Sequence, residues 1–373
     1  MHRGVQALIG WMEENSQQEG VVLQPPATAA ELHAVEDRIL SPLPADLAMV
    51  LRRCNGARLP TGQLLGAADA TEADSIQRTL RDLAAAMERS EHDPEVLLPF
   101  FRNDDGGILA FDRSAGPLAD TWPIVDYYPD NGELRLVYRT FDGFCRVCVA
   151  NWTAEDFADT FSLEKYLMEG KRHAQIEPDV SVAHATVAHA LRRAGRPEHA
   201  LQRYLTAARC VPSLAWCDWE ALKIAALLRD APAVLEAASR LAARAPAARW
   251  ALRETSPQQV ADVLRHVVGL LEPRERVLRL LDQLAAQAFD KAACDHIVAL
   301  RRAVFAGQPL PPPMPIRPCA VPPRSDPSDW MLRLRGAYEV GAVRDDDLLL
   351  EPAYAPLRKR PDFADILRIP RHF

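Results

Sequence analysis

The sequence has no apolar run long enough for a membrane span and no framework of paired cysteines. Its 373 residues are 48% hydrophobic and 25% charged, and no stretch approaches the roughly 18 apolar residues that indicate a transmembrane helix. Residues 1–18 lack a long apolar core and a small-residue cleavage site, so we do not expect a secretion signal. The seven cysteines are odd in number and irregularly spaced, which favours reduced thiols. These absences predict a cytoplasmic protein, and the length of 373 residues predicts two or three domains.

Motifs of common catalytic and metal chemistry are also missing. The chain has no G-x-x-x-x-G-K-[ST] loop, G-x-S-x-G elbow or G-x-G-x-x-G turn. Cys145-x-x-Cys148 has no second pair to complete a metal site, and on a strand the two thiols would face opposite sides. His184 and His189 are five positions apart, whereas a helical zinc pair is four apart. The sequence therefore predicts no catalytic residue, no cofactor and no metal ligand.

Residues 97–152 are rich in aromatic and β-branched side chains and predict a series of short strands. Asp130-Asn131-Gly132 separates two of them, and an Asn-Gly pair between strand-like runs is a strong hairpin signal. The alternation of apolar and polar residues predicts antiparallel strands with one buried and one solvated face. The expected strands are residues 107–112, 122–127 and 134–139, followed by a last strand that carries Cys145, Val147 and Val149, with a closing helix that begins at Thr153.

Helical patterns precede this region. Residues 5–12 and 29–40 each carry apolar side chains on one helical face. A further helix, residues 46–54, is expected to end at Asn55-Gly56, a natural left-handed cap.

The order of these features resembles the SUKH superfamily. The features are a helix, a Leu43-Pro44-x-Asp46 helix start, an Asn55-Gly56 helix end, a run from Leu98 to Asp112 and a Trp122–Val125 strand. The resemblance covers roughly residues 5–172 and implies an α+β domain that binds another protein. In bacteria such domains resemble immunity proteins that neutralise a cognate toxin, and in fungi they resemble regulators of cell-wall synthesis. A helical insert between Thr71 and Arg89 departs from the pattern.

The rest of the chain predicts helices. Residues 181–214 are expected to form a helical hairpin, with Ala188 and Ala200 at the close contact, Gly195 in the turn and Pro197 at the start of the second helix. This pattern resembles a tetratricopeptide (TPR-like) repeat, and Pro246 follows Pro212 at the repeat's 34-residue period. A second hairpin turns at residues 229–232 without a glycine, and a third helical region covers residues 257–305.

Prolines crowd residues 307–327 and predict an extended spacer, with a polyproline ligand as the alternative. The expected domains are therefore residues 1–172, a SUKH-like α+β domain; residues 176–306, a TPR-like all-α domain; residues 307–327, a linker; and residues 328–373, a helical cap. Tyr354, Leu357, Phe363, Ile366 and Leu367 are the expected anchors of that cap.

The negative charge is concentrated at the front of the chain. Residues 1–175 hold 28 acids and 16 bases, a balance of −12, whereas residues 176–306 hold 14 acids and 18 bases, a balance of +4. An acidic surface repels nucleic acid and attracts a basic partner, although it can also serve solubility alone. The candidate protein-binding residues are acids on turns and strand ends: Asp104, Asp105, Asp112, Asp126, Asp130 and Glu133.

Three functions follow as hypotheses. The first is a non-enzymatic protein-binding module, a bacterial immunity protein whose acidic SUKH-like domain binds a basic toxin domain. The second is a regulatory scaffold, acting in cell-wall or stress regulation, that binds partners through the helical array. The third is an enzyme, which would require a deep pocket of convergent reactive side chains. The sequence favours the first and predicts no membrane partner.

Overall fold

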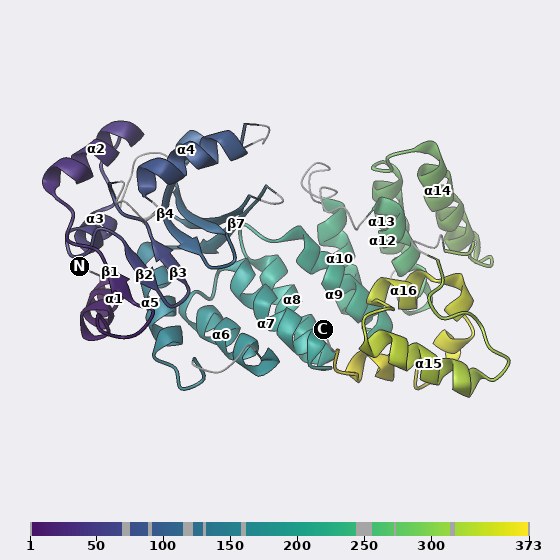
Figure 1. The fold of residues 1–373 in the computed structure, drawn as a ribbon. Coiled ribbons are helices and arrows are strands. Elements are labelled where there is room, and N and C mark those ends of the chain that lie inside the picture. The colour runs from purple at the N-terminus through teal and green to yellow at the C-terminus, as the bar shows by residue number, and fades with distance from the viewer. Residues whose placement is uncertain are drawn as a thin grey trace. The chain divides into compact units, whose positions relative to one another are not determined.

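The chain divides into two compact units, residues 1–183 and residues 184–373. The computed structural model (Figure 1) describes residues 2–68, 75–88, 92–114, 122–129, 132–157, 162–243, 256–271, 274–313 and 318–371. None of the helices in these ranges is both long and apolar enough to cross a membrane.

The first unit is built on one antiparallel sheet of seven strands, which are hydrogen-bonded in chain order. Each strand pairs with the next, although two α-helices separate the first strand from the second and one α-helix separates the third from the fourth. The α+β class is therefore confirmed. The strands are β1 (Val22–Leu23), β2 (Ala57–Leu59), β3 (Gly62–Leu64), β4 (Leu97–Asn103), β5 (Ile108–Asp112), β6 (Ile124–Tyr128) and β7 (Glu133–Tyr138).

Helices cover both faces of this sheet (Figure 1). On one face, two side chains pack on Ile108 and Tyr127. They are Leu83 of α4 and Met87, the residue that directly follows α4. On the other face, α1, α2, α3 and α5 enclose the larger core, which includes four clustered phenylalanines, Phe100, Phe111, Phe141 and Phe144. The helices are α1 (Arg3–Glu14), α2 (Ala29–Ile39), α3 (Ala45–Leu51), α4 (Ile76–Ala86), α5 (Phe141–Trp152) and α6 (Leu163–Ile176), with a 3₁₀ turn η1 (Pro94–Val96).

The prediction of a last strand around Cys145 is wrong, because residues 141–152 form helix α5. Thr140 caps this helix by accepting a hydrogen bond from the Gly143 amide, at 3.0 Å. The expected helix start at Thr153 is instead the end of α5, and the next helix, α6, is capped by Ser162.

The second unit is helical in every described segment. Its helices are α7 (Ser181–Arg193, which begins in the first unit), α8 (Pro197–Arg209), α9 (Ala215–Leu228), α10 (Ala231–Ala243), α12 (Pro257–Leu264), α13 (Arg274–Ala285), α14 (Lys291–Ala306), α15 (Pro327–Glu339) and α16 (Asp345–Leu350). Short 3₁₀ turns are η2 (Val268–Leu270), η3 (Pro352–Tyr354), η4 (Leu357–Lys359) and η5 (Ala364–Arg368).

Helices α7 and α8 form the expected hairpin. Gly195 turns the chain with a φ of +70°, and Ala188 and Ala200 are both fully buried. In the next hairpin, Arg229 occupies the left-handed conformation with a φ of +60°, where the first hairpin has a glycine. Pro246, which set the 34-residue period, lies outside the described residues.

The last residues of the chain pack back onto earlier helices of the second unit. All five expected anchors, Tyr354, Leu357, Phe363, Ile366 and Leu367, are buried. Part of the proline-rich segment joins them, since the Val321 amide donates to the Tyr354 hydroxyl at 3.3 Å and the Trp330 indole donates to the Val321 carbonyl at 3.2 Å. These residues are therefore held in place and do not form a free spacer.

A buried ion pair fixes this docking. Arg192 in α7 donates to both carboxylate oxygens of Asp345 in α16, at 3.0 and 2.6 Å, and both side chains are 4% exposed. Arg371 and the Tyr338 hydroxyl donate to the same carboxylate, at 2.7 and 2.6 Å. Burial opposes ionisation of Asp345, yet Arg192 and Arg371 hold its pKa below the ordinary value.

Candidate protein-binding surface

The turn between β4 and β5 presents two exposed carboxylates, Asp104 and Asp105. Gly106 adopts a φ of +91°, and the Asp105 carboxylate accepts a hydrogen bond from the Gly107 amide at 3.1 Å. An aspartate that binds its own turn in this way fixes the loop. Asp104 pairs with Arg58 at 2.8 Å, in a solvent-exposed contact.

Asp126 lies inside the protein, so the prediction that it is an exposed acid on a turn is wrong. It is only 5% exposed and lies in the middle of β6, opposite Leu109 of β5 and Arg135 of β7. Because side chains alternate along a strand, Asp126 shares a face with Ile124 of the larger core. Burial of a carboxylate at this place requires compensation from its neighbours.

Tyr128 and Arg135 connect the acids. The Tyr128 hydroxyl donates to Asp105 at 3.0 Å, and the Arg135 guanidinium lies over the Tyr128 ring, 4.6 Å from its centroid. Arg135 Nη2 is 3.9 Å from Asp126 Oδ2, and its Nε is 3.8 Å from Glu133 Oε1. We name Asp104, Asp105, Asp126 and Glu133 the acidic turn cluster.

The cluster holds more negative charge than its cations balance. Burial is the main reason that the pKa of Asp126 is raised to about 6, and repulsion from Asp105 and Glu133 adds to it, against the attraction of Arg135. Among the described residues, Asp126 Oδ1 is buried with no hydrogen-bond partner. Such groups are rare in native proteins and often mark a function.

Two predicted residues do not join the cluster. Asp112 lies at the opposite end of β5, where it pairs with Leu97, and its carboxylate accepts a hydrogen bond from the Ser114 amide at 2.9 Å. Asp130 lies outside the described residues.

The sequence prediction did not include Arg58, Tyr128 and Arg135 in the site. It also did not identify Gly107, whose missing side chain makes room for Asp126. A Cβ on Gly107 would lie 2.7 Å from Asp126 Oδ1, so this glycine leaves room for the buried carboxylate. Arg135 carried a usable signal, since it alternates with apolar residues on β7. Its pairing with Asp126 depends on the register of β6 and β7.

The two cysteines of the C-x-x-C motif lie on helix α5, where positions three apart share a face. Both are buried, and burial raises the pKa of each thiol well above its ordinary value. Both thiols therefore remain protonated. The described residues contain no group of three His, Cys, Asp or Glu side chains placed to hold a metal ion.

These features define the first unit as an α+β domain with an acidic cluster at one end of its sheet. Residues 26–146 match the sequence profile of the SMI1 / KNR4 family (SUKH-1), which confirms the resemblance for that part of the chain. The match covers 121 of the 373 residues. Neither a curated protein nor a solved structure matches the chain.

The raised pKa of Asp126 predicts a pH-dependent stability. The folded carboxyl binds its proton more tightly than the unfolded one, so the folded state holds more protons between about pH 4 and pH 6. The free energy of unfolding therefore falls as pH rises through this window. Asp126→Asn removes the buried charge, and we expect it to stabilise the first unit by up to about 3 kcal/mol at pH 8, which is the free energy that corresponds to the raised pKa and already includes the attraction of Arg135.

Hydrogen exchange of the β5–β7 amides in the full chain, compared between pH 4 and pH 8, measures this effect. The difference between Asp126→Asn and the unmodified protein should be small at pH 4 and grow with pH. A difference that is the same at both pH values contradicts the assignment.

Proposed function

We propose that the first unit is a non-enzymatic protein-binding module, an immunity protein that neutralises a cognate bacterial toxin through the acidic turn cluster. The resemblance of residues 26–146 to SUKH-1 domains supports a protein-binding role. The balance of −12 over residues 1–175 favours a basic partner and disfavours nucleic acid.

The observation that carries this proposal is the buried carboxylate of Asp126. Its unpartnered Oδ1 and raised pKa lower the stability of the unit, and destabilising polar groups in native proteins concentrate at functional sites. Asp105 and Glu133, near Asp126 in the cluster, give a basic side chain of a partner two further carboxylates to contact. Such a side chain would relieve the repulsion within the cluster.

Reversing charge in the cluster tests the proposal. We expect Asp105→Lys/Glu133→Lys in the full chain to weaken binding to the cognate toxin by about 100-fold, because like charges across an interface cost several kcal/mol. The toxin encoded beside the gene is the first partner to test. Growth of cells that express both proteins, together with the dissociation constant, provides the readout.

Asp112 supplies the matched control. Asp112→Lys/Glu95→Lys makes the same change in net charge outside the cluster, since Asp112 lies at the other end of β5 and Glu95 in η1. These cells should remain protected. Equal protection by the cluster variant and the control variant would reject the acidic turn cluster as the binding surface.

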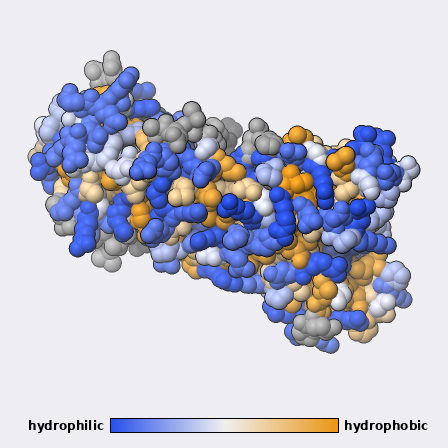
Figure 2. Space-filling view, turned by 90° about the horizontal axis from the view of Figure 1, so that it is seen from below, coloured by the Kyte–Doolittle hydropathy of each residue, from blue (hydrophilic) through white to orange (hydrophobic). Residues whose placement is uncertain are grey.

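The second candidate function is a regulatory scaffold in cell-wall or stress regulation, with the TPR-like helical array of residues 176–306 as the part that binds partners. Exposed large hydrophobic side chains favour it, since six of the nine found among the described residues lie in the second unit. On the face shown in Figure 2, hydrophobic residues also gather mainly over the C-terminal half of the chain. If this function holds, Phe305→Asp should abolish partner capture while the charge reversal at Asp105 and Glu133 leaves it intact.

A further inference from the structure

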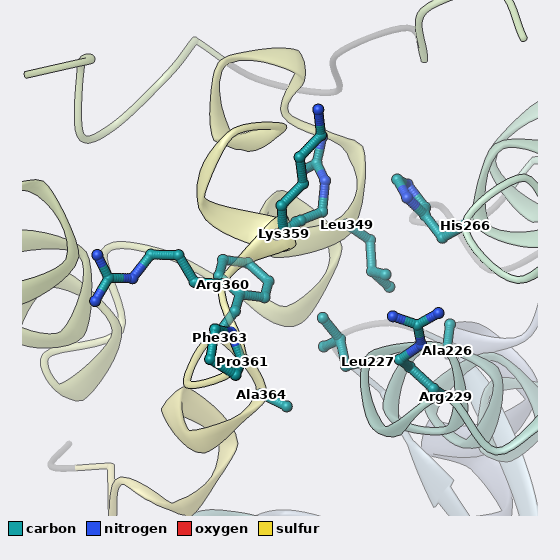
Figure 3. A pocket seen from close by; sticks show the side chains of 11 residues that line it. Ala226, Leu227, Arg229, His266, Leu349, Lys359, Arg360, Pro361, Phe363 and Ala364 are labelled. Atoms are coloured by element: carbon teal, nitrogen blue, oxygen red, sulfur yellow. The ribbon is translucent and has the colours of Figure 1, made fainter. Parts of the chain in front are cut away.

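Two neighbouring cavities in the second unit share a basic wall. One has a volume of about 270 Å³ and lies between the end of α9, the end of α12 and the segment after α16 (Figure 3). The other has a volume of about 510 Å³ and is closed on one side by Leu310, Pro312 and Pro313. His266, Arg358 and Lys359 line both. The larger volume falls within the range of roughly 300–1,000 Å³ that is usual for small-molecule sites.

The walls carry positive charge with no carboxylate among the described residues that line them. The cationic side chains are Arg229, Arg265, Arg358, Lys359 and Arg360. Arg360 is paired with Asp362, at 2.9 Å, and Figure 3 shows it pointing away from the others. For Arg229, Arg265 and Lys359, no carboxylate of the described residues lies within ion-pairing distance. Among the described residues, Asp262 attracts Arg265 and Glu351 attracts Arg358, but neither carboxylate lines a cavity.

Two nitrogen atoms at the larger cavity have unused hydrogen-bonding capacity. Arg265 Nη1 and His266 Nε2 are buried and have no hydrogen-bond partner among the described residues. Arg358, by contrast, is held in place, because its Nη1 donates to the carbonyls of Leu348 and Glu351, both at 2.9 Å. Since buried polar groups normally have partners and a guanidinium nitrogen can only donate, the free Arg265 Nη1 points to a ligand that carries oxygen atoms.

The cations around the two cavities repel one another and His266. Burial and then repulsion from Arg265 lower the pKa of Arg358 to about 10, and burial followed by repulsion from Arg358 and Arg265 lowers the pKa of His266 to about 3. A bound anion would remove this repulsion.

Arg229 reaches the cavity from a strained turn. Its backbone has a φ of +60°, and a residue with a side chain loses roughly 1–2 kcal/mol in this conformation. Glycine fills the same place in the preceding hairpin. Strain of this kind gathers at ligand sites.

We propose that the two cavities form a site for a phosphorylated ligand. Its phosphate groups are bound by Arg358 and Lys359, which line both cavities, together with Arg229 at the smaller and Arg265 at the larger cavity. A single carboxylate brings one negative charge, whereas a phosphate or pyrophosphate brings two or more, which suits walls that carry several cations. The guanidinium fork also matches the spacing of phosphate oxygens. The site lies within the second unit and is independent of the acidic turn cluster.

Calorimetric titration of the full chain with inorganic pyrophosphate at low ionic strength tests the proposal. The unmodified protein should bind pyrophosphate. Lys359→Ala and Arg229→Gly should each weaken binding at least about tenfold, because each removes a charged hydrogen-bond donor. Both variants are expected to fold, since Lys359 is exposed and glycine relieves the strain at position 229. Lys291→Ala, which removes an exposed lysine outside both cavities, should bind as the unmodified protein does.

Further titrations identify the source of the phosphate. A nucleoside diphosphate that binds more tightly than pyrophosphate indicates a nucleotide, and vesicles containing a phosphorylated inositol lipid that bind more tightly indicate a lipid headgroup. Both results support the site. It is overturned if pyrophosphate does not bind, if the Arg229→Gly/Lys359→Ala double variant binds as tightly as the unmodified protein, or if citrate binds as tightly as pyrophosphate.

Discussion

Asp345→Ala is expected to lower the free energy of unfolding of the second unit by about 3–5 kcal/mol, because it leaves a buried arginine without its counter-ion. Arg192 donates two hydrogen bonds to Asp345 and a third, at 2.9 Å, to the Leu367 carbonyl. Without the carboxylate, the charge of Arg192 stays buried, and its remaining contacts are the hydrogen bond to the Leu367 carbonyl and the Tyr338 ring, whose centroid is 5.4 Å away. Lys223, which is also buried and close enough to influence Asp345, loses a favourable interaction as well.

Urea unfolding of the full chain, followed through hydrogen exchange of α7 and α16, measures this loss. Asp329→Ala is the matched control, since Asp329 pairs with Arg333 on the surface, where the two side chains are 43% and 54% exposed. Such exposed pairs contribute at most about 1 kcal/mol. A loss for Asp345→Ala no larger than that for Asp329→Ala would show that the buried pair does not hold the segment after α15 in place.

Gly195→Ala is expected to destabilise the second unit by about 2–5 kcal/mol, as the sum of two effects. The backbone at Gly195 has a φ of +70°, which an alanine adopts only at a cost. In addition, a Cβ there would lie 2.3 Å from the Arg368 carbonyl oxygen. Because that atom belongs to the backbone, either the turn or the segment around η5 must move.

Gly307 separates the two effects. Its φ is +66°, and a Cβ there would meet nothing within 4 Å, so Gly307→Ala should lose only the conformational term of about 1–2 kcal/mol. Thermal unfolding of both variants gives the comparison. Equal losses would mean that the contact between Gly195 and Arg368 does not constrain the fold.

Much of the fold could be predicted from local patterns, because its strands follow one another and its turns carry glycine. The error at residues 141–152 has a physical cause. Cys145, Val147 and Val149 alternate as a strand would, but Phe141, Phe144, Cys145, Cys148 and Trp152 follow helical spacing and are buried on α5. The longer pattern, together with the Thr140 cap, would have indicated the helix.

The acidic turn cluster and the basic cavities were harder to predict from the sequence, because both depend on contacts between residues that are far apart in the chain. Asp126 is followed by Tyr127-Tyr128 in a strand pattern, yet its pKa is raised by burial first and by repulsion from Asp105 next, and the missing side chain of Gly107 leaves room for the carboxylate. In the second unit, Arg229, Arg265 and Arg358 come from three separate segments, and each alone resembles an ordinary surface arginine.

The ion pair between Arg192 and Asp345 joins residues 153 positions apart, which affects how the protein is made. A ribosome that adds roughly 5–20 residues per second needs about 8–30 s to synthesise the intervening chain. During that interval the arginine has no Asp345 carboxylate to pair with. The contact between α7 and α16 that this pair fixes can therefore form only late in synthesis, after the whole first unit has been made.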